Sequence, residues 1–205
     1  MKKTTVILAV LALAAFAGQI SVNLDPIDRS DADWLVYDNG SPAWLTWGGV
    51  YRGVWFNVDD FYTGALGASI EQSQFWFYHH ASYPWDTSSF YAEIWNGTAP
   101  NITTLLDQST GTAVHYAPVF VSYATPIVTE PNFWCFTNTV MSSGGWPASL
   151  GDGGPSAVAH SYNGDTSALI PWVVASQNCN YFISVLADPV VSLSRTTWGS
   201  MKTVF

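Results

Sequence analysis

The stretch PNFWCFTNTVMSSGGWPASLGDGGPSAVAHSY, residues 131–162, decides the fold of this chain. It begins with an aromatic segment that predicts a β-strand. A long glycine-rich loop follows, which carries Trp146 and Asp152, and a second strand is expected to start at Ala157. Loops that connect two core strands commonly carry the functional residues of a β-sandwich. This loop is therefore the first place to look for a binding surface.

Outside this stretch the chain alternates between short β-type segments and turn residues. The clearest strand is Ser73–His80, where aromatic side chains point alternately to the two faces. Pro118 and Pro126 indicate edge strands or a bulge. Residues 43–50 and 98–112 are expected to be loops, the second with one short helical turn. Further strands are expected at 34–37, 51–58, 90–95, 113–123, 126–129, 169–174 and 180–187.

These segments predict an all-β fold, namely an antiparallel β-sandwich of roughly nine strands and of the jelly-roll type. The pattern shows no amphipathic helix of useful length, no internal repeat and no break between domains.

The first residues predict export. Lys2 and Lys3 precede an apolar run that ends at an Ala-Phe-Ala cleavage pattern, so residues 1–17 have the composition of a secretory signal peptide. The run is shorter than the roughly 20 residues that span a bilayer, so contact with a membrane is expected only before cleavage. The rest divides into a linker (18–33), a β-sandwich domain (34–194) and a C-terminal tail (195–205). The expected location is extracellular, either secreted or at the cell surface.

Charge and composition narrow the classes of partner. The formal net charge is −9 for the whole chain and becomes −11 once Lys2 and Lys3 are removed. Such a chain repels a phosphate backbone, so nucleic-acid binding is not expected. Charged residues make up 10% and aromatic residues 16% of the chain. This composition is typical of a rigid extracellular sandwich rather than of a disordered chain.

Two cysteines, Cys135 and Cys179, remain after export. An even number of cysteines in an oxidising compartment predicts a disulfide between them. The alternative is two separate buried thiols, because strand positions alone do not place the two Cα atoms within bonding range.

Short motifs across the chain give it a resemblance to a known family. They are Phe133-Trp134-Cys135, Asn138-Thr139, Gly144-Gly145-Trp146-Pro147, Leu150-Gly151-Asp152, Ala159-His160-Ser161-Tyr162 and Ile170-Pro171-Trp172, with 36–40 and 196–202 near the two ends. In these motifs the chain resembles jelly-roll β-sandwich modules of large secreted proteins from poorly cultured bacterial phyla. Such modules are often found ahead of a C-terminal sorting domain. The resemblance implies a non-catalytic part and assigns no activity.

No pattern in the sequence predicts an active site. A jelly-roll glycoside hydrolase needs two carboxylates facing each other across a cleft, and the glutamates are only Glu71, Glu93 and Glu130. Glu93 has aromatic neighbours in sequence, but the simpler interpretation places it on the solvent face of a strand. There is no Gly-x-Ser-x-Gly motif for a serine hydrolase. The protein is therefore not expected to be an enzyme, and a glycoside hydrolase is the weakest alternative.

Metal sites are weakly indicated. The adjacent His79 and His80 face opposite sides of a strand and cannot both bind one ion without a bulge. No cofactor is expected, although a structural calcium ion is a candidate, because oxygen ligands in loops suit calcium. The loop aspartates that could supply such ligands are Asp59, Asp60, Asp152 and Asp165.

The tryptophans are the best functional lead. Trp44, Trp47, Trp85 and Trp146 are expected in loops beside glycine or proline, where they could stack on sugar rings or instead fold back over the sandwich. The leading hypothesis is a secreted, non-catalytic β-sandwich module with a structural or adhesive role at the cell surface or in an extracellular assembly. The alternative is a carbohydrate-binding module that uses these tryptophans. The expected partners are a polysaccharide, other surface proteins, or further copies of the chain through its edge strands.

Overall fold

The computed structural model describes residues 18–27, 34–165 and 168–191. Within these ranges the chain forms fifteen β-strands and one 3-10 turn, η1 (Val58–Asp60). All strand pairs within the sheets are antiparallel, so the predicted all-β antiparallel fold is confirmed. The predicted number of nine strands is wrong, partly because three strands have only two residues each. Among the described residues, no helix has the length and apolar character needed to cross a membrane. The proposed signal peptide and C-terminal tail lie outside the described residues.

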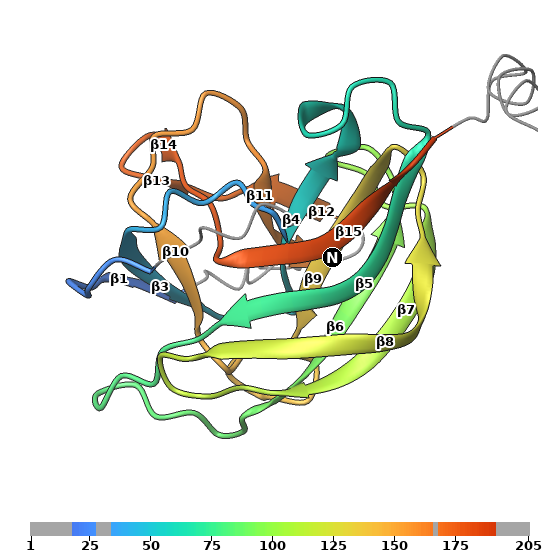
Figure 1. Cartoon of the computed structure of the whole chain (residues 1–205). Helices are drawn as coiled ribbons and strands as arrows, with labels where there is room; N and C mark the ends of the chain where they lie inside the picture. The colour runs from blue at the N-terminus through green and yellow to red at the C-terminus, as the bar shows by residue number, and fades with distance from the viewer. Residues whose placement is uncertain (1–17, 28–33, 166–167, 192–205) are drawn as a thin grey trace, which may run out of the picture.

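Two large sheets pack against each other in a sandwich-like arrangement (Figure 1). The larger sheet has six strands in the order β12-β11-β4-β9-β6-β7, and the smaller has four in the order β2-β15-β5-β8. The larger sheet contains β4 (Tyr51–Asn57), β6 (Ser89–Asn96), β7 (Thr104–Thr112), β9 (Asn132–Asn138), β11 (Ser161–Asp165) and β12 (Ala168–Pro171). The smaller contains β2 (Trp34–Leu35), β5 (Gly67–Trp76), β8 (Pro118–Val128) and β15 (Ile183–Val190).

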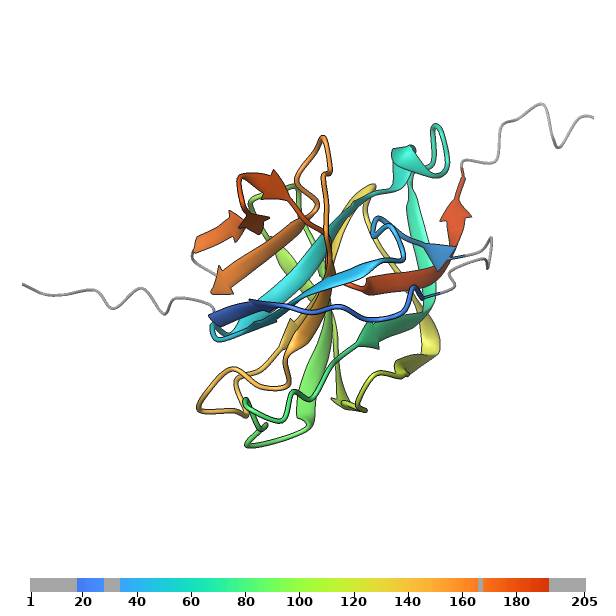
Figure 2. The same ribbon diagram turned by 90° about the vertical axis from the view of Figure 1, so that its left-hand side faces the viewer.

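Two further sheets extend one side of the sandwich (Figure 2). In a three-stranded sheet, β3 (Pro42–Trp47) lies between β1 (Gly18–Ser21) and β10 (Ser149–Asp152). The hairpin of β13 (Val173–Val174) and β14 (Gln177–Asn178) forms the fourth sheet. The segment expected to be a linker therefore begins with a strand, because residues 18–21 pair with β3.

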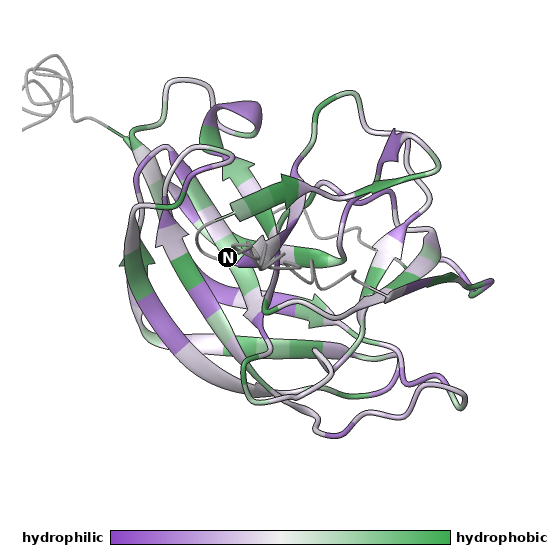
Figure 3. Ribbon diagram, turned by 180° about the vertical axis from the view of Figure 1, so that it is seen from behind, coloured by the Kyte–Doolittle hydropathy of each residue, from purple (hydrophilic) through white to green (hydrophobic). Residues whose placement is uncertain are grey.

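The main core fills the space between the two large sheets. Phe90 on β6 crosses this space to contact Phe75 on β5, with ring centroids 5.2 Å apart in an edge-on arrangement. Hydrophobic residues alternate with hydrophilic ones along many of the strands, as expected for sheets with one face in the core (Figure 3). The fully buried members from both sheets include Val54, Phe56, Ile70, Phe75, Phe90, Ile94, Phe133 and Val185.

The outer face of the six-stranded sheet carries a second hydrophobic cluster. Trp134 and Phe136 on β9 are fully buried there, with their rings stacked at 5.2 Å. The Trp134 indole Nε1 donates a hydrogen bond to the Asn101 carbonyl at 3.2 Å, so the β6–β7 loop contacts this cluster. Both faces of β9 are therefore buried, which explains why all its residues after Asn132 are inaccessible.

Three segments expected to be loops contain strands instead. Residues 98–112 contain β7, whose Thr, Ser and Gln side chains suit an exposed edge strand but hide the β pattern. Residues 43–50 contain most of β3. The glycine-rich loop of the opening stretch contains β10, where Gly151 is required because its Cβ would lie 2.1 Å from the Trp172 ring. The strand expected at Ala157 begins at Ser161.

The predicted disulfide is wrong, since Cys135 and Cys179 are both free and buried. Cys135 lies in the middle of β9, where its Sγ is 3.5 Å from the Ser73 hydroxyl on the opposing sheet. Cys179 follows β14, and its Sγ lies 3.7 Å from the Gln177 carbonyl. Burial raises the pKa of the Cys135 thiol to about 12 and also raises the pKa of Cys179. The alternative of two separate buried thiols is the one the structure contains.

Candidate functional site

Three connecting segments meet at one end of the sandwich, which we call the loop end: residues 77–88, 113–117 and 139–147. The first two are joined by backbone hydrogen bonds from Tyr116 N to Phe77 O and from Ala113 N to Ser88 O. The third is joined to the first by Ser143, whose amide and hydroxyl both donate to Asp86. In Figure 2 the 77–88 and 139–147 segments lie side by side at the bottom of the view. The loop end thus combines residues that are far apart in sequence.

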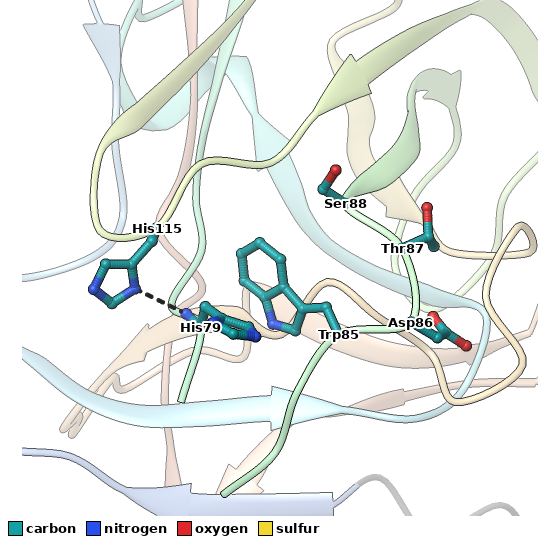
Figure 4. A pocket seen from close by; sticks show the side chains of 6 residues that line it. All are labelled: His79, Trp85, Asp86, Thr87, Ser88 and His115. Atoms are coloured by element: carbon teal, nitrogen blue, oxygen red, sulfur yellow. Dashed lines mark hydrogen bonds between the residues drawn. The ribbon is translucent and has the colours of Figure 1, made fainter. Parts of the chain in front are cut away.

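An open pocket of about 560 Å³ lies at the loop end. The half-buried Trp85 indole lies at its centre, with two imidazoles on one side and an acidic and hydroxyl-bearing segment on the other (Figure 4). An aromatic surface with a few polar groups around it is typical of small-molecule sites. The lining residues are His79, Trp85, Asp86, Thr87, Ser88 and His115.

The two histidines are held by contacts that define their roles. The His79 backbone N–H donates a hydrogen bond to Nδ1 of His115 at 3.1 Å (Figure 4). Because Nδ1 is the acceptor, the neutral His115 ring carries its proton on Nε2. The His79 ring packs edge-on against Trp85, with ring centroids 5.1 Å apart. Both imidazoles are exposed, so their remaining polar atoms are available to a ligand.

The acidic side of the pocket is pre-organised. The Asp86 carboxylate Oδ2 accepts hydrogen bonds from the Ser143 amide at 3.0 Å and the Ser143 hydroxyl at 2.9 Å. Hydrogen bonding from Ser142, together with that from Ser143, lowers the pKa of Asp86 below its usual value. The side chain is therefore an anion at neutral pH, and it fixes the position of the 77–88 segment against the 139–147 segment.

An aromatic stack lies beside the pocket. The indoles of Trp47 and Trp146 are nearly parallel, at 16°, with centroids 5.3 Å apart. Tyr83 contacts the same Trp47 ring at 4.6 Å, and its own side chain is 36% exposed. Because each tryptophan covers part of the other, Tyr83 is the exposed ring of this group.

A buried arginine supports the stack from inside. Arg52 on β4 is fully buried, and its Nη1 and Nη2 donate to the carbonyls of Gly48 and Pro147 at 3.0 and 2.7 Å. These carbonyls belong to the residues that follow Trp47 and Trp146. Its Nε also donates to the Ser149 hydroxyl at 2.9 Å. Arg52 thereby fixes the chain immediately after both stacked tryptophans.

The turn at Gly48, after Trp47, and the turn at Gly145, before Trp146, also touch through their backbones. Gly145 has φ +74°, and a Cβ on it would lie 2.5 Å from the backbone of Gly48. Only glycine has both the conformational freedom and the small size that this contact requires. The position of Trp146 relative to Trp47 is therefore set by close backbone packing as well as by ring stacking.

Two of the four predicted tryptophans, Trp85 and Trp146, lie at the loop end, and Trp47 reaches it from the end of β3. Trp85 lines the pocket, and Trp47 and Trp146 form the adjacent stack. Trp44 is instead partly buried against the main core. Both Trp44 and Trp47 belong to strand β3, so the assignment of these two residues to a loop was wrong. The four do not form an exposed coplanar row.

The predicted calcium ligands are not brought together. Asp152 is 1% exposed and accepts backbone hydrogen bonds from Asn39, Gly154 and Asn180, a structural role. The other candidates occupy different places: Asp59 and Asp60 are in η1, and Asp165 ends β11. Among the described residues, no group of three or more His, Cys, Asp or Glu side chains could hold a metal ion.

Glu93 lies neither on a solvent face nor in a cleft. It is 1% exposed within the cluster on the outer face of the six-stranded sheet. Its carboxylate accepts hydrogen bonds from the Trp95 indole, the Gln108 amide and the Asn138 amide at 2.7, 2.7 and 2.6 Å. The expectation of a solvent-facing Glu93 was therefore wrong, because neutral donors satisfy the buried charge.

Sequence reasoning did not assign His79, His115, Thr87, Ser88 or Tyr83 to this site. Their convergence depends on long-range pairing, in particular that of β5 with β8, which places residues 79 and 115 next to each other. The local signal was the segment Tyr83-Pro84-Trp85-Asp86, where two aromatic residues and a carboxylate follow the end of a strand. That combination is unusual for a simple turn and marks a candidate binding loop.

Comparison of the chain with models of protein families, with curated proteins and with solved structures gave no match. Function therefore has to be inferred from the chemistry of the loop end itself.

Proposed function

We propose that this protein is a secreted, non-catalytic β-sandwich module that attaches to carbohydrate through the pocket at the loop end. The observation that carries the proposal is the lining of this pocket: an indole surrounded by imidazole, hydroxyl and carboxylate groups. A sugar ring has an apolar face of C–H groups and a rim of hydroxyls. The indole suits the face, and the polar groups suit the rim.

The chemistry of the individual groups supports this assignment. The Asp86 carboxylate accepts hydrogen bonds from hydroxyl groups, and the Nε2–H of His115 donates them. Thr87 and Ser88 carry hydroxyls that can do either. Because Asp86 and His115 are already held by protein contacts, little side-chain entropy is lost when a ligand binds.

A binding role is favoured over hydrolysis by the position of Glu93. This glutamate is enclosed by neutral donors and is 1% exposed, so it does not face substrate across a cleft as a glycosidase carboxylate must. An adhesive module at the cell surface or in an extracellular assembly needs only the pocket and a stable scaffold.

The same proposal includes a jelly-roll topology for the scaffold. Numbered in chain order, the eight strands of a jelly roll form sheets 1-8-3-6 and 2-7-4-5. The orders β2-β15-β5-β8 and β4-β9-β6-β7 follow this rule. The pairs β11–β12 and β13–β14 and the β1-β3-β10 sheet are then additions to the basic fold. This topology is common among lectin domains and accords with the resemblance to secreted jelly-roll modules.

The test is binding of the mature chain to a panel of soluble neutral polysaccharides, including xylan, mannan, mixed-linkage glucan and hydroxyethyl cellulose. Binding is measured by affinity electrophoresis and by quenching of tryptophan fluorescence. We expect at least one polysaccharide to bind and Trp85→Ala to weaken that binding about tenfold or more. The matched control is Phe120→Ala, which removes a half-exposed aromatic ring of β8 that does not line the pocket.

Two results would refute the proposal. One is the absence of binding to every polysaccharide of the panel. The other is a Trp85→Ala variant that binds as tightly as the unmodified protein, since the indole would then lie outside the site.

A further inference from the structure

We infer that the pocket and the exposed ring of Tyr83 form one continuous site for an extended, uncharged glycan chain, with successive sugar units over Trp85 and over Tyr83. This inference rests on the proposed function and specifies the class of ligand. It would extend the site beyond the pocket, onto a ring that does not line it.

The closeness of the two residues in the chain supports one ligand that reaches both side chains. Tyr83 and Trp85 are separated by one residue, Pro84, so their Cα atoms are no more than about 7 Å apart. Two side chains on residues this close can be reached by a saccharide chain of a few units. A proline between them also restricts the backbone of the segment, because its ring fixes φ.

Tyr83 is exposed and yet held in place. One side of its ring contacts Trp47 at 4.6 Å, and it also packs against His80 at 5.4 Å. A backbone hydrogen bond from Tyr83 N to His80 O closes the turn that carries it. An exposed aromatic ring that is already ordered offers contact area at a low cost in conformational entropy.

The support beneath Tyr83 is itself rigid. Trp47 is stacked on Trp146, and Arg52 binds the carbonyls that follow both tryptophans. The stack therefore has a specific role in this inference: it positions Tyr83 and does not contact the glycan face to face.

The negative charge of the protein favours an uncharged glycan as the ligand. The chain has a formal net charge of −9, and the Asp86 carboxylate stands in the pocket with a lowered pKa. Uronate or sulfate groups on a ligand would be repelled, and this repulsion would lower both the rate and the strength of association.

The experiment measures the dependence of affinity on chain length. Isothermal titration calorimetry is carried out with the monosaccharide, disaccharide and tetrasaccharide of xylose, mannose and glucose series. We expect the tetrasaccharide to bind about tenfold more tightly than the monosaccharide. Tyr83→Ala should remove this gain, so that the tetrasaccharide binds no more tightly than the monosaccharide. Tyr83→Phe keeps the ring and should keep the gain, which shows that the ring rather than the hydroxyl contributes it.

The outcomes distinguish the two proposals. If affinity does not depend on length, or if Tyr83→Ala weakens all lengths equally, the extended site is refuted while a sugar site at Trp85 stands. If a polyuronate binds more tightly than the neutral tetrasaccharide, the selection for uncharged chains is refuted. If no saccharide of any length binds, the proposed function fails, and the extended site fails with it.

Discussion

Replacement of Arg52 by methionine tests how the loop end is held. Arg52 is fully buried and donates to three neutral acceptors: the Gly48 and Pro147 carbonyls and the Ser149 hydroxyl. Arg52→Met leaves these three acceptors without their donor inside the protein. Each buried polar group that loses its partner costs about 1–3 kcal/mol.

A second effect acts in the opposite direction. Burial lowers the pKa of Arg52 to about 10, which means that the cation is less stable here than in water by about 3 kcal/mol. Methionine removes that unfavourable term and fills a similar volume. The three unsatisfied acceptors outweigh the relief, so we expect Arg52→Met to lower the free energy of unfolding by about 3 kcal/mol.

The assay is urea unfolding followed by tryptophan fluorescence, with linear extrapolation to water. Thr110→Met, on the exposed edge strand β7, is the matched control and should change stability by less than about 0.5 kcal/mol. Arg52→Lys should lose at least as much as Arg52→Met, because lysine keeps the buried charge without the planar fork of donors. An Arg52→Met variant as stable as the unmodified protein would refute the conclusion that the hydrogen bonds of Arg52 stabilise the loop end. An Arg52→Lys variant with full stability would show that charge alone, and not the fork, is required.

Two further predictions concern the turns and the thiols. Gly145→Ala should destabilise the fold by about 3 kcal/mol or more, because its left-handed backbone and its contact with Gly48 both exclude a Cβ. Gly64 has a similar positive φ, but a Cβ there would have no atom within 4 Å, so Gly64→Ala should lower the free energy of unfolding by only about 1 kcal/mol. Equal losses for the two variants in urea unfolding would contradict the close-contact argument. Cys135, with its pKa raised to about 12, and Cys179 should both resist a thiol reagent at pH 8 in the native protein, and two thiols should react in denaturant without reductant. Detection of no thiol in denaturant would indicate a disulfide instead.

The sequence predicted the central strands well because each has a strong local signal. Aromatic and β-branched residues mark β4, β6 and β9, and the structure places strands at all three. The bounds expected for the fourth strand, 73–80, were wrong, because β5 begins at Gly67 and ends at Trp76. The prolines of β8 indicated an edge strand, and β8 does lie at the edge of its sheet. Polar β7 and short, glycine-containing β10 were missed, since their conformation is imposed by the strands beside them rather than by their own composition.

The candidate site was predictable only in part. Trp47, Trp85 and Trp146 stand out by residue type and by their glycine and proline neighbours. Trp85 and Trp146 lie at the loop end, and Trp47 stacks on Trp146 from the end of β3. The partners that complete the site do not stand out in this way, because the contact of His79 with His115 arises only when β5 and β8 pair. The predicted disulfide was wrong for a related reason, because the number of cysteines indicates nothing about the distance between them in the fold.

The burial of both faces of β9 has a consequence for how the strands find their alignment. In a half-exposed strand, a slip of one residue is prevented because it would turn the apolar side chains toward water. For β9 that penalty is weak, since hydrophobic material lies on both sides. A slip of β9 against β6 would, however, turn Asn138 away from Glu93 and remove the 2.6 Å hydrogen bond to a buried carboxylate. The hydrogen bond between Asn138 and Glu93 thus favours one alignment of β9 against β6. In this role the buried carboxylate of Glu93 is structural and contacts neither solvent nor substrate.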